Sequence, residues 1–368
     1  MQKSIVNNND VSAHKQSALI WRQFTKHRLA VFSLFVLLLL YTVGVIFPEF
    51  FAPYLKQYRT DQNYTPPTKV RFIDVDGNFH MRPFIYRTEQ NMNAETWELE
   101  YIADTSKMYP IHFIVHGQEY EFLGLFKTDL HLFGVEEEAN LFILGTDSLG
   151  RDLFSRTIYA CRISLTIGFV GTFISLVLGL LIGGLAGLLG GVFDDIIQRI
   201  IEMLMSIPKI PMWMALSAAI PQNWSALQIY FAITIILSFL GWTGLARVVR
   251  SKFLSIREED FINAAISYNS PIWTIIVRHM IPNFITYVIV SVTLAIPAMI
   301  LAETSLSFLG IGLQPPIVSL GVLLQQAQQF QTVQLYPWIL IPGFIVVFVV
   351  LAYNFVGDGL RDAADPYN

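Results

Sequence analysis

The sequence predicts an all-α polytopic membrane protein with six transmembrane helices and a small β-rich domain inserted between helices one and two. Hydrophobic residues make up 54% of the 368 residues and charged residues only 14%, whereas a soluble domain usually has about 25% charged residues. Several long runs contain no charge, as is typical of helices that cross a bilayer. A mean hydropathy of +0.50 excludes a disordered chain, and a net charge of −4 gives no basic footprint for nucleic acid.

The first helix follows a basic N-terminal tail, residues 1–28, which has five Lys or Arg residues and one acid. Residues 29–47 then form a run of nineteen residues without a charge. That run exceeds the roughly 7–15 residues of a signal-peptide core, and no small-residue cleavage site follows it. We therefore expect an uncleaved transmembrane helix within residues 29–51, with its tail in the cytoplasm because basic flanks stay inside.

Splitting the later charge-free runs at Gly, Pro and polar clusters gives five more helices. Their expected ranges are 163–186, 198–219, 228–247, 283–303 and 337–357. Six spans that start inside place the C-terminal tail, residues 358–368, in the cytoplasm as well. The loop expected between helices four and five is then cytoplasmic, and it is basic, as the positive-inside rule requires. Its basic residues are Arg247, Arg250, Lys252, Arg257 and Arg278.

The segment 52–152 lies outside in this topology and is acidic, with sixteen Asp or Glu residues against nine Lys or Arg. Alternating residues on both sides of Asp76-Gly77 predict one β-hairpin. A second hairpin is expected around His116-Gly117, and Trp97, Leu99 and Tyr101 suggest a further strand.

Metal binding in this segment is not expected. His112 and His116 lie four residues apart, but no cysteine or dense acidic cluster completes a ligand set. We therefore interpret both as solvated histidines. The single cysteine, Cys161, excludes an internal disulfide.

The predicted cytoplasmic loop, residues 250–282, contains the most informative pattern. Phe261, Ala264, Ala265 and Tyr268 repeat at helical spacing, and Asn269 can end that helix in a left-handed conformation. Ser270-Pro271 then resembles an N-cap followed by proline at the first helical position. Pro282 is expected to break the second helix before helix five. Taken alone, this pattern fits a functional helix–turn–helix and an ordinary amphipathic connector equally well.

This loop resembles the EAA loop of binding-protein-dependent ABC importer permeases, whose pattern is Glu-Ala-Ala, three residues, Gly, then nine residues and Ile-x-Leu-Pro. Ala264-Ala265 matches the alanine pair, and the segment ends in His279-Met280-Ile281-Pro282. Asn269 stands at the glycine position, where Asn is the usual substitute. Asn263 stands at the glutamate position, with three acids, Glu258, Glu259 and Asp260, just upstream.

Three other stretches, residues 144–168, 301–316 and 357–366, resemble the C-type permease subunit of dipeptide, oligopeptide and nickel importers. The likeness covers residues 141–368 closely and 19–50 loosely. It implies the type I permease fold of ABC importers, with residues 153–357 as the permease core. It gives no role for residues 52–140.

The resemblance also implies a division of labour. Such a permease forms half of a peptide pathway with a second homologous permease, in a bacterial or archaeal plasma (inner) membrane. Two ATPase subunits bind ATP and Mg, and an extracytoplasmic binding protein delivers the substrate. This chain has no G-x-x-x-x-G-K-[ST] sequence, so we expect no enzyme activity, catalytic residue or cofactor in it. The expected ATPase-coupling residues are Glu259, Asp260, Asn263, Ala264, Ala265, Asn269, Pro271, His279 and Pro282.

Small residues recur every fourth position along the second predicted helix: Gly171, Ser175, Gly179, Gly183, Gly187 and Gly191. Such a stripe lets transmembrane backbones approach closely, so we expect it to pack against another permease helix.

Three further residues are candidates for the translocation pathway or its gate. Glu303 is the only acid in a long apolar stretch, and ionisable residues in such places are functional candidates, although simple solvation at the outer interface is an equal alternative. Pro297 can kink helix five. Gln314 begins a polar segment, expected to be an external loop that dips back into the protein. Thr146-Asp147 resembles a helix N-cap.

Three alternatives stay open. The same machinery could carry oligosaccharides or nickel and other metal chelates, because the binding protein largely selects the cargo. The chain could be a membrane receptor with an external sensing domain, although that role requires a cytoplasmic signalling domain and we expect none after residue 357. An intramembrane enzyme is disfavoured because the spans contain no Ser/His or paired-Asp constellation.

Overall fold

The computed structural model describes residues 19–92, 99–122, 124–136, 138–221 and 223–364. The chain divides into two compact units. We call residues 1–38, 167–306 and 347–368 the helical unit, and residues 39–166 and 307–346 the mixed unit.

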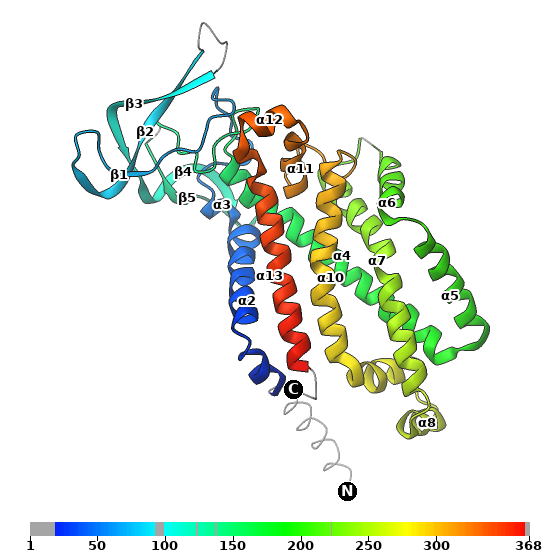
Figure 1. The fold of residues 1–368 in the computed structure, drawn as a ribbon. Helices are drawn as coiled ribbons and strands as arrows, with labels where there is room; N and C mark the ends of the chain where they lie inside the picture. Colours follow the sequence, from blue (N-terminus) through cyan, green and yellow to red (C-terminus); the bar gives the residue numbers. More distant parts are fainter. Residues whose placement is uncertain (1–18, 93–98, 123, 137, 222, 365–368) are drawn as a thin grey trace. The chain divides into compact units, whose positions relative to one another are not determined.

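Within the described residues, five helices are long and apolar enough to cross a membrane. They are α2 (Arg28–Tyr41) with the π turn η1 (Thr42–Ile46), α4 (Leu153–Leu189), α7 (Ala226–Ile256), the stretch Ile272–Phe308 that contains α10 (Ile285–Phe308), and the stretch Pro337–Ala364 that contains α13 (Ile341–Ala364). In an 18-residue apolar window of each span, between 22% and 44% of the residues are buried within this chain. The other residues of these windows are therefore available to lipid or to other subunits. Figure 1 draws the long helices as coiled ribbons.

The prediction of one continuous helix over 198–219 is wrong. The structure has two helices there, α5 (Gly191–Ser206) and α6 (Lys209–Ala218), which meet at 88°. Ile207 adopts an extended conformation between them, because the ring of Pro208 disfavours helical backbone in the residue before it. The pair counts as a sixth span only if the bent helices cross the membrane together.

Several of the expected boundaries are also wrong. Helices α10 and α13 continue to Phe308 and Ala364, past the expected ends at 303 and 357. Helix α4 begins about ten residues earlier than the expected 163. Helix α7 continues to Ile256, so Arg247, Arg250 and Lys252 lie on its last turns and not in a loop. Lys and Arg have good helix propensity, so a change from apolar to basic residues does not mark a helix end.

Shorter helical elements connect the long ones. They are α3 (Pro48–Phe51), α8 (Asp260–Ser267), α9 (Ile272–Thr274), η2 (Ile275–Met280), η3 (Ile281–Phe284), α11 (Leu320–Leu324), η4 (Gln325–Gln328), α12 (Phe330–Leu335) and η5 (Pro337–Leu340). Pro282 lies within η3, and the chain continues directly into α10. The expected helix break at Pro282 is therefore wrong, because the chain changes from π to 3₁₀ hydrogen bonding there without a loop.

The helical unit has tight packing between α4 and α7. A Cβ on Gly187 would lie 2.6 Å from the Cβ of Phe253, and one on Gly183 would collide with the backbone of Ala246. A Cβ on Gly179 would lie 3.0 Å from the side chain of Leu245 in α7. Gly171 lies against Met299 of α10 and Ser238 of α7. Gly191 lies beyond the end of α4 and is not part of this stripe.

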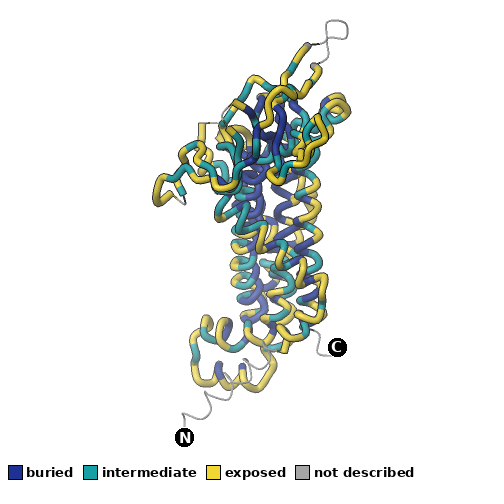
Figure 2. The backbone as a smooth tube through the Cα atoms, turned by 90° about the vertical axis from the view of Figure 1, so that its left-hand side faces the viewer, coloured by how far each residue is buried: buried dark blue, intermediate teal, exposed yellow. Residues whose placement is uncertain are grey.

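A second apolar cluster holds α5 and α6 against α7. Its buried members are Ile201, Leu204, Leu240, Trp242 and Ala246. Figure 2 shows that the long helices carry both buried and exposed residues along their lengths.

The mixed unit contains two small antiparallel sheets. Strands β1 (Arg71–Ile73), β2 (Phe79–Met92) and β3 (Leu99–Pro110) form one sheet, and β4 (His112–Phe122) and β5 (Phe126–Gly134) form the other. The buried cluster beside them consists of Ile85, Tyr109, Ile111, Ala139 and Leu141, and the partly buried Phe133 of β5 packs against it.

The hairpin predicted at Asp76-Gly77 is confirmed, since Ile73 pairs with Phe79 and Gly77 has a φ of +88°. The hairpin predicted at His116-Gly117 is wrong, because β4 runs through both residues and turns at Gly124 instead (φ +69°). The pairing register shifts between His116 and Tyr120, so Gly117 marks an irregularity within a strand. Leu99 and Tyr101 lie in β3, whereas Trp97 lies outside the described residues.

Candidate functional site

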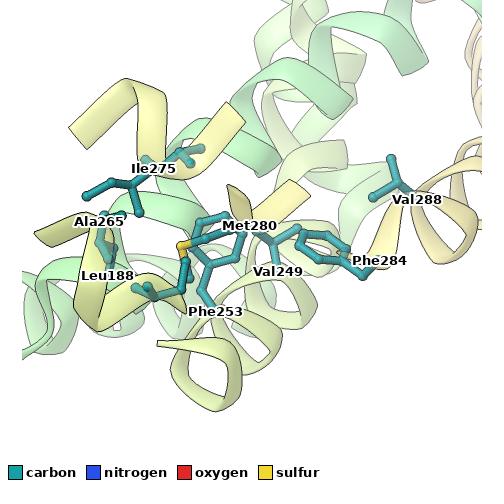
Figure 3. Close-up of a cluster of buried hydrophobic side chains, with 10 residues drawn as sticks. Leu188, Val249, Phe253, Ala265, Ile275, Met280, Phe284 and Val288 are labelled. Carbon is teal, nitrogen blue, oxygen red and sulfur yellow. The ribbon is translucent and has the colours of Figure 1, made fainter. Parts of the chain in front are cut away.

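Helix α8 and the turn that follows it are anchored in the helical unit by apolar packing. Ile262 and Ala265 are buried on one side of α8. They join a cluster with residues of α4, α7, η2, η3 and α10, namely Leu188, Val249, Phe253, Ile275, Ile276, Met280, Phe284 and Val288. Figure 3 shows these side chains converging from separate helices. Fully burying a side chain such as Ile262 contributes about 1.5–3 kcal/mol, so a displacement of α8 is resisted by the helices around it.

The turn after α8 has the geometry expected of an Asn-terminated helix. Asn269 has a φ of +57°, which Asn tolerates better than most residues. The N–H of Asn269 donates to the Ile266 carbonyl at 2.8 Å, and the N–H of Ser270 donates to the Ala265 carbonyl at 3.1 Å. This pair of bonds is a Schellman motif. Asn269 therefore ends α8 in the left-handed conformation that its sequence position predicts.

The cap expected at Ser270 is wrong by one residue. Pro271 is itself the N-cap of α9, with an extended ψ of 142° and no side-chain capping bond. Its carbonyl accepts from the N–H groups of Thr274 and Ile275. The backbone N–H groups at the start of a helix have no partner within the helix. Proline, which has no N–H, therefore loses no hydrogen bond at this position.

The other side of α8 is open. Phe261 and Ala264 are exposed, and the side chain of Tyr268 at its end is 86% exposed. Ile266, Ile272 and Trp273 are also exposed. We call Phe261, Ala264, Ile266, Tyr268, Ile272 and Trp273 the α8 outer face.

The remaining coupling residues predicted from the sequence lie on this same segment. Asp260 is in the first turn of α8 and Glu259 is its N-cap, without a side-chain capping bond. Asn263 and Pro282 are exposed, and His279 is half-buried in η2.

An ion pair that the sequence analysis missed ties α5 to α7. Two guanidinium nitrogens of Arg250, Nε and Nη2, donate to the carboxylate of Asp194, which lies in the first turn of α5. Arg257 donates to the carbonyl of Leu188 at 3.3 Å, the last turn of α4. Two charged residues 56 positions apart give no local signal of pairing. Together these contacts hold the end of α4 and the first turn of α5 against the end of α7, just before α8.

The pathway candidates divide between the two units. Glu303 lies in α10 of the helical unit and is fully buried, so solvation at an interface does not describe it. Pro297 is a buried residue inside the same helix. Gln314 belongs to the mixed unit, is exposed, and donates from Nε2 to the Gly310 carbonyl at 2.7 Å.

A buried charged cluster precedes α4 in the mixed unit. Asp147 accepts from Arg151 Nε at 2.8 Å and from Nη1 of Arg156, and its side chain also accepts the N–H groups of Leu149 and Arg151. Asp147 therefore organises the loop and is not the helix cap. The cap is Asp152, whose carboxylate accepts from the Ser155 N–H at 2.7 Å.

The carboxyl group of Asp152 has a raised pKa. Burial raises the pKa of its carboxyl to about 7, against the opposing effect of the hydrogen bonds from Ser155. Its Oδ1 has no hydrogen-bond partner in the described part of the chain. An unpaired buried oxygen favours the protonated form.

The described residues contain no group of three His, Cys, Asp or Glu side chains that could hold a metal ion. His112 and His116 both lie on β4, and His116 Nδ1 is 2.9 Å from Asp129 Oδ2. His131 is buried, with its ring nitrogens at hydrogen-bond distance from the carbonyls of Ala52 and Gln118. His116 and His131 therefore have structural contacts within the chain.

Comparison with known proteins gives two family matches. Residues 175–367 match the binding-protein-dependent transport system inner membrane component. Residues 15–67 match the N-terminal transmembrane domain of oligopeptide transport permease C.

Several curated proteins are similar over much of their length. The oligopeptide transport system permease protein OppC of Haemophilus influenzae is 41% identical over 60% of this chain and 69% of its own. The dipeptide transport system permease protein DppC of Lactococcus lactis is 31% identical over 94% of this chain and 89% of its own. DppC of Bacillus subtilis is 30% identical, with coverage of 94% and 84%.

Among solved structures, the MetNI methionine ABC transporter in inward-facing conformations matches 57% of this chain and 97% of the solved one. The identity is 18% and the TM-score 0.45.

The two dipeptide permeases align with 94% of this chain, so the similarity extends into the segment between α3 and α4. The family match over 175–367 and the near full-length similarity to DppC show that this chain belongs to the family of inner membrane components of binding-protein-dependent transport systems.

Proposed function

We propose that this chain is the membrane-spanning permease subunit of an ATP-driven importer of peptides. With a second, homologous permease it forms a pathway through the plasma (inner) membrane, and an extracytoplasmic binding protein delivers the peptide. The similarity to oligopeptide and dipeptide transport permeases supports this cargo. The observation that carries the proposal is the two-sided α8, buried on one side and open on the other.

The α8 outer face supplies the docking surface for one ATPase subunit. Its aromatic residues Phe261, Tyr268 and Trp273 are exposed, and aromatic side chains contribute strongly at protein interfaces. The opposite face is packed on α4, α7 and the helix that leads into α10. A displacement of α8 by the ATPase is therefore transmitted to three membrane helices. ATP and Mg are bound by the ATPase subunits, and this chain acts as the mechanical element.

The segment from Asp260 to Pro282 is tested by changes confined to its open side. Ala264→Arg and Tyr268→Ala alter exposed positions and should reduce both ATPase retention on the complex and ATP-driven uptake by tenfold or more, since interface anchors typically contribute about 2 kcal/mol or more. Ala265→Asp is a poor probe because Ala265 is buried in the cluster. A charge there would disturb folding.

The matched control is Phe330→Ala, an exposed aromatic residue of α12 that is 80% exposed. It should retain the ATPase at the wild-type level. Full ATPase retention and coupled uptake in Ala264→Arg and Tyr268→Ala would refute the docking assignment.

We propose that both termini are cytoplasmic and that residues 52–152 are extracytoplasmic. The basic residues near α8 support this orientation by the positive-inside rule. A cysteine introduced at Met81, which is 92% exposed, should react with a membrane-impermeant thiol reagent on intact cells. A cysteine at Tyr268 should react only after the membrane is opened.

The sheets of the mixed unit are proposed to receive the binding protein. Phe72, Ile73, Val75, Phe79 and Met81 leave an exposed apolar surface on β1, β2 and the turn between them, which is typical of an interaction site. Tyr86 and Met108 are directly paired. Replacing residues 87–107 by Asn-Gly should therefore close a shorter hairpin with Ile85 and Tyr109 still in the core.

The substitutions Phe72→Ser and Met81→Ser test the apolar surface itself. The shortened variant tests whether the far part of the β2–β3 hairpin, residues 87–107, also contacts the binding protein. Loss of binding-protein association with intact ATPase association would support the docking role. Unchanged binding-protein association in all three variants would exclude it.

The cargo is tested by the ligand that co-purifies with the binding protein. Peptides are expected. An oligosaccharide or a nickel chelate would replace the cargo while leaving the permease assignment in place. A receptor role predicts no ATP-dependent uptake of any ligand.

A further inference from the structure

The helical unit contains a hollow between α4, α7 and α10, at about the middle of α4 and α7 and along the first half of α10. Its volume is about 180 Å³, and its walls include Thr172, Ser175, Gly241, Gly244, Tyr287 and Ser291. The other lining residues are apolar, and none carries a charge. The hollow is separate from α8 and from every pathway candidate identified from the sequence.

One polar group in this hollow has no partner. Thr172 is only 2% exposed, and its Oγ1 makes no hydrogen bond within the described part of the chain. Two other helical threonines of this unit donate to the carbonyl one turn earlier, Thr234 to Tyr230 at 2.7 Å and Thr293 to Ile289 at 2.9 Å. The buried Thr304 hydroxyl, outside the hollow, is also unpaired in the described part of the chain. Thr172 does not use that local option. An unpaired buried hydroxyl costs about 1–3 kcal/mol, so an external partner is the simplest compensation.

Glycine residues keep the hollow open. No atom of the described chain lies within 4 Å of a Cβ placed on Gly244. A Cβ on Gly241 would instead collide with Ser175, whose Oγ donates to the Ser238 carbonyl at 3.2 Å. Gly241 thus serves the contact between α4 and α7, whereas Gly244 faces free space. A methyl group would fit at Gly244, so the glycine is not required for packing within this chain.

The chemistry of the walls selects an uncharged polar group. Hydroxyls of Thr, Ser and Tyr both donate and accept hydrogen bonds, which suits the N–H and C=O of a peptide bond. A charged group would meet no counter-charge here and would be strongly disfavoured at the middle of membrane helices. The volume is below the roughly 300–1,000 Å³ of pockets that enclose a whole small ligand, so it accommodates about one residue of a longer chain.

We propose that this hollow faces the translocation pathway and binds the main chain of the passing peptide, with Thr172 as its principal hydrogen-bonding group. The inference rests on the proposed peptide importer and adds the residues that contact its cargo. Contact with the main chain and not with side chains lets one site serve peptides of different sequence.

The first test uses the full importer in proteoliposomes with its binding protein. Thr172→Val removes the hydroxyl at nearly constant shape, and folding should not suffer because the hydroxyl has no partner in the chain. Peptide uptake should fall about fivefold, the equivalent of one neutral hydrogen bond of about 1 kcal/mol. The loss should be similar for peptides with different side chains. Gly244→Leu fills the hollow and should reduce uptake further.

Thr234→Val is the matched control, because the Thr234 hydroxyl is used within its own helix. It should transport at close to the wild-type rate. Wild-type uptake in both Thr172→Val and Gly244→Leu would overturn the inference. Failure of the wild-type complex to import any peptide would instead overturn the proposed function, so the two failures are distinguishable.

The second test asks whether the hollow faces water or lipid. Gly244→Cys should react with a water-soluble maleimide in the assembled importer, and added peptide should slow this labelling. The native Cys161 is buried, so the wild-type chain gives the background. Labelling only by a lipid-soluble maleimide would place the hollow against lipid and refute the inference.

Discussion

The buried carboxylate of Asp147 should be one of the most sensitive single positions in the mixed unit. Its side chain is 2% exposed and bonds two arginines, of which Arg151 is 12% and Arg156 only 4% exposed. Asp147→Asn preserves the shape and can still accept a backbone N–H, but it removes the only charge that these bonds share. Breaking a buried ion pair from one side costs about 3–5 kcal/mol, because the remaining charge loses its compensation.

The magnitude translates into a measurable thermal shift. At roughly 2–4 °C per kcal/mol for a domain of 150–250 residues, Asp147→Asn should lower the melting temperature of the purified complex by on the order of 10 °C. Glu138→Gln is the control, since the Lys107–Glu138 pair is 50% and 64% exposed. Exposed pairs contribute about 0–1 kcal/mol, so this variant should melt close to the wild type.

A second substitution tests the physical cause. Arg156→Met in the Asp147→Asn background removes one uncompensated buried charge. The double variant should therefore be less destabilised than the sum of the two single variants. A thermal shift in Asp147→Asn no larger than that of Glu138→Gln, or strict additivity in the double variant, would refute this reasoning.

Three further predictions concern packing and charge. Gly183→Leu should reduce complex yield and stability by at least about 1–3 kcal/mol, because its side chain would meet the Ala246 backbone; Gly244→Ala, with free space at its Cβ, should retain normal yield in the same detergent-extraction assay. Asp152 has a pKa raised to about 7 by burial, so its contribution to stability is present below about pH 4 and is lost as the pH rises through 7. Asp152→Asn, which keeps a good N-cap, should therefore gain in melting temperature relative to the wild type as the pH increases from 5 to 8; an equal difference at both pH values would contradict the assignment. Asp194→Asn should weaken the attachment of α5 to Arg250 and accelerate proteolysis near residue 190, whereas Glu202→Gln, in an exposed pair, should not.

The sequence predicted the membrane helices well where a charge-free run had clear ends, because hydrocarbon excludes charge over a fixed thickness. It failed where helices extend past the membrane, as at Arg247–Ile256 of α7, since basic residues continue a helix as readily as apolar ones. The α5–α6 bend has a visible local cause in Pro208. The prediction over 198–219 gave the apolar run more weight than the proline.

The candidate coupling segment was predictable because its signals are local. Helical spacing set α8, and the tolerance of Asn for positive φ placed the turn at Asn269. Contacts between distant residues were not predictable. The Asp194–Arg250 pair and the Thr172 hollow depend on how α4, α7 and α10 approach one another, and a single sequence does not encode that approach in any short pattern. The turn at Gly124 was missed because His116-Gly117 offered an equally good hairpin signal.

The central claim, that ATPase binding at α8 drives peptide movement through this chain, is tested most directly by one reconstitution. The chain is purified by its own tag together with its partners, placed in proteoliposomes with the binding protein, and assayed for peptide uptake and ATP hydrolysis in parallel. We expect a second permease and two ATPase subunits in the purified complex and uptake that requires ATP. Ala264→Arg should abolish that uptake with the chain still inserted in the membrane. ATP-independent uptake, or unchanged ATP-driven uptake in Ala264→Arg, would contradict it.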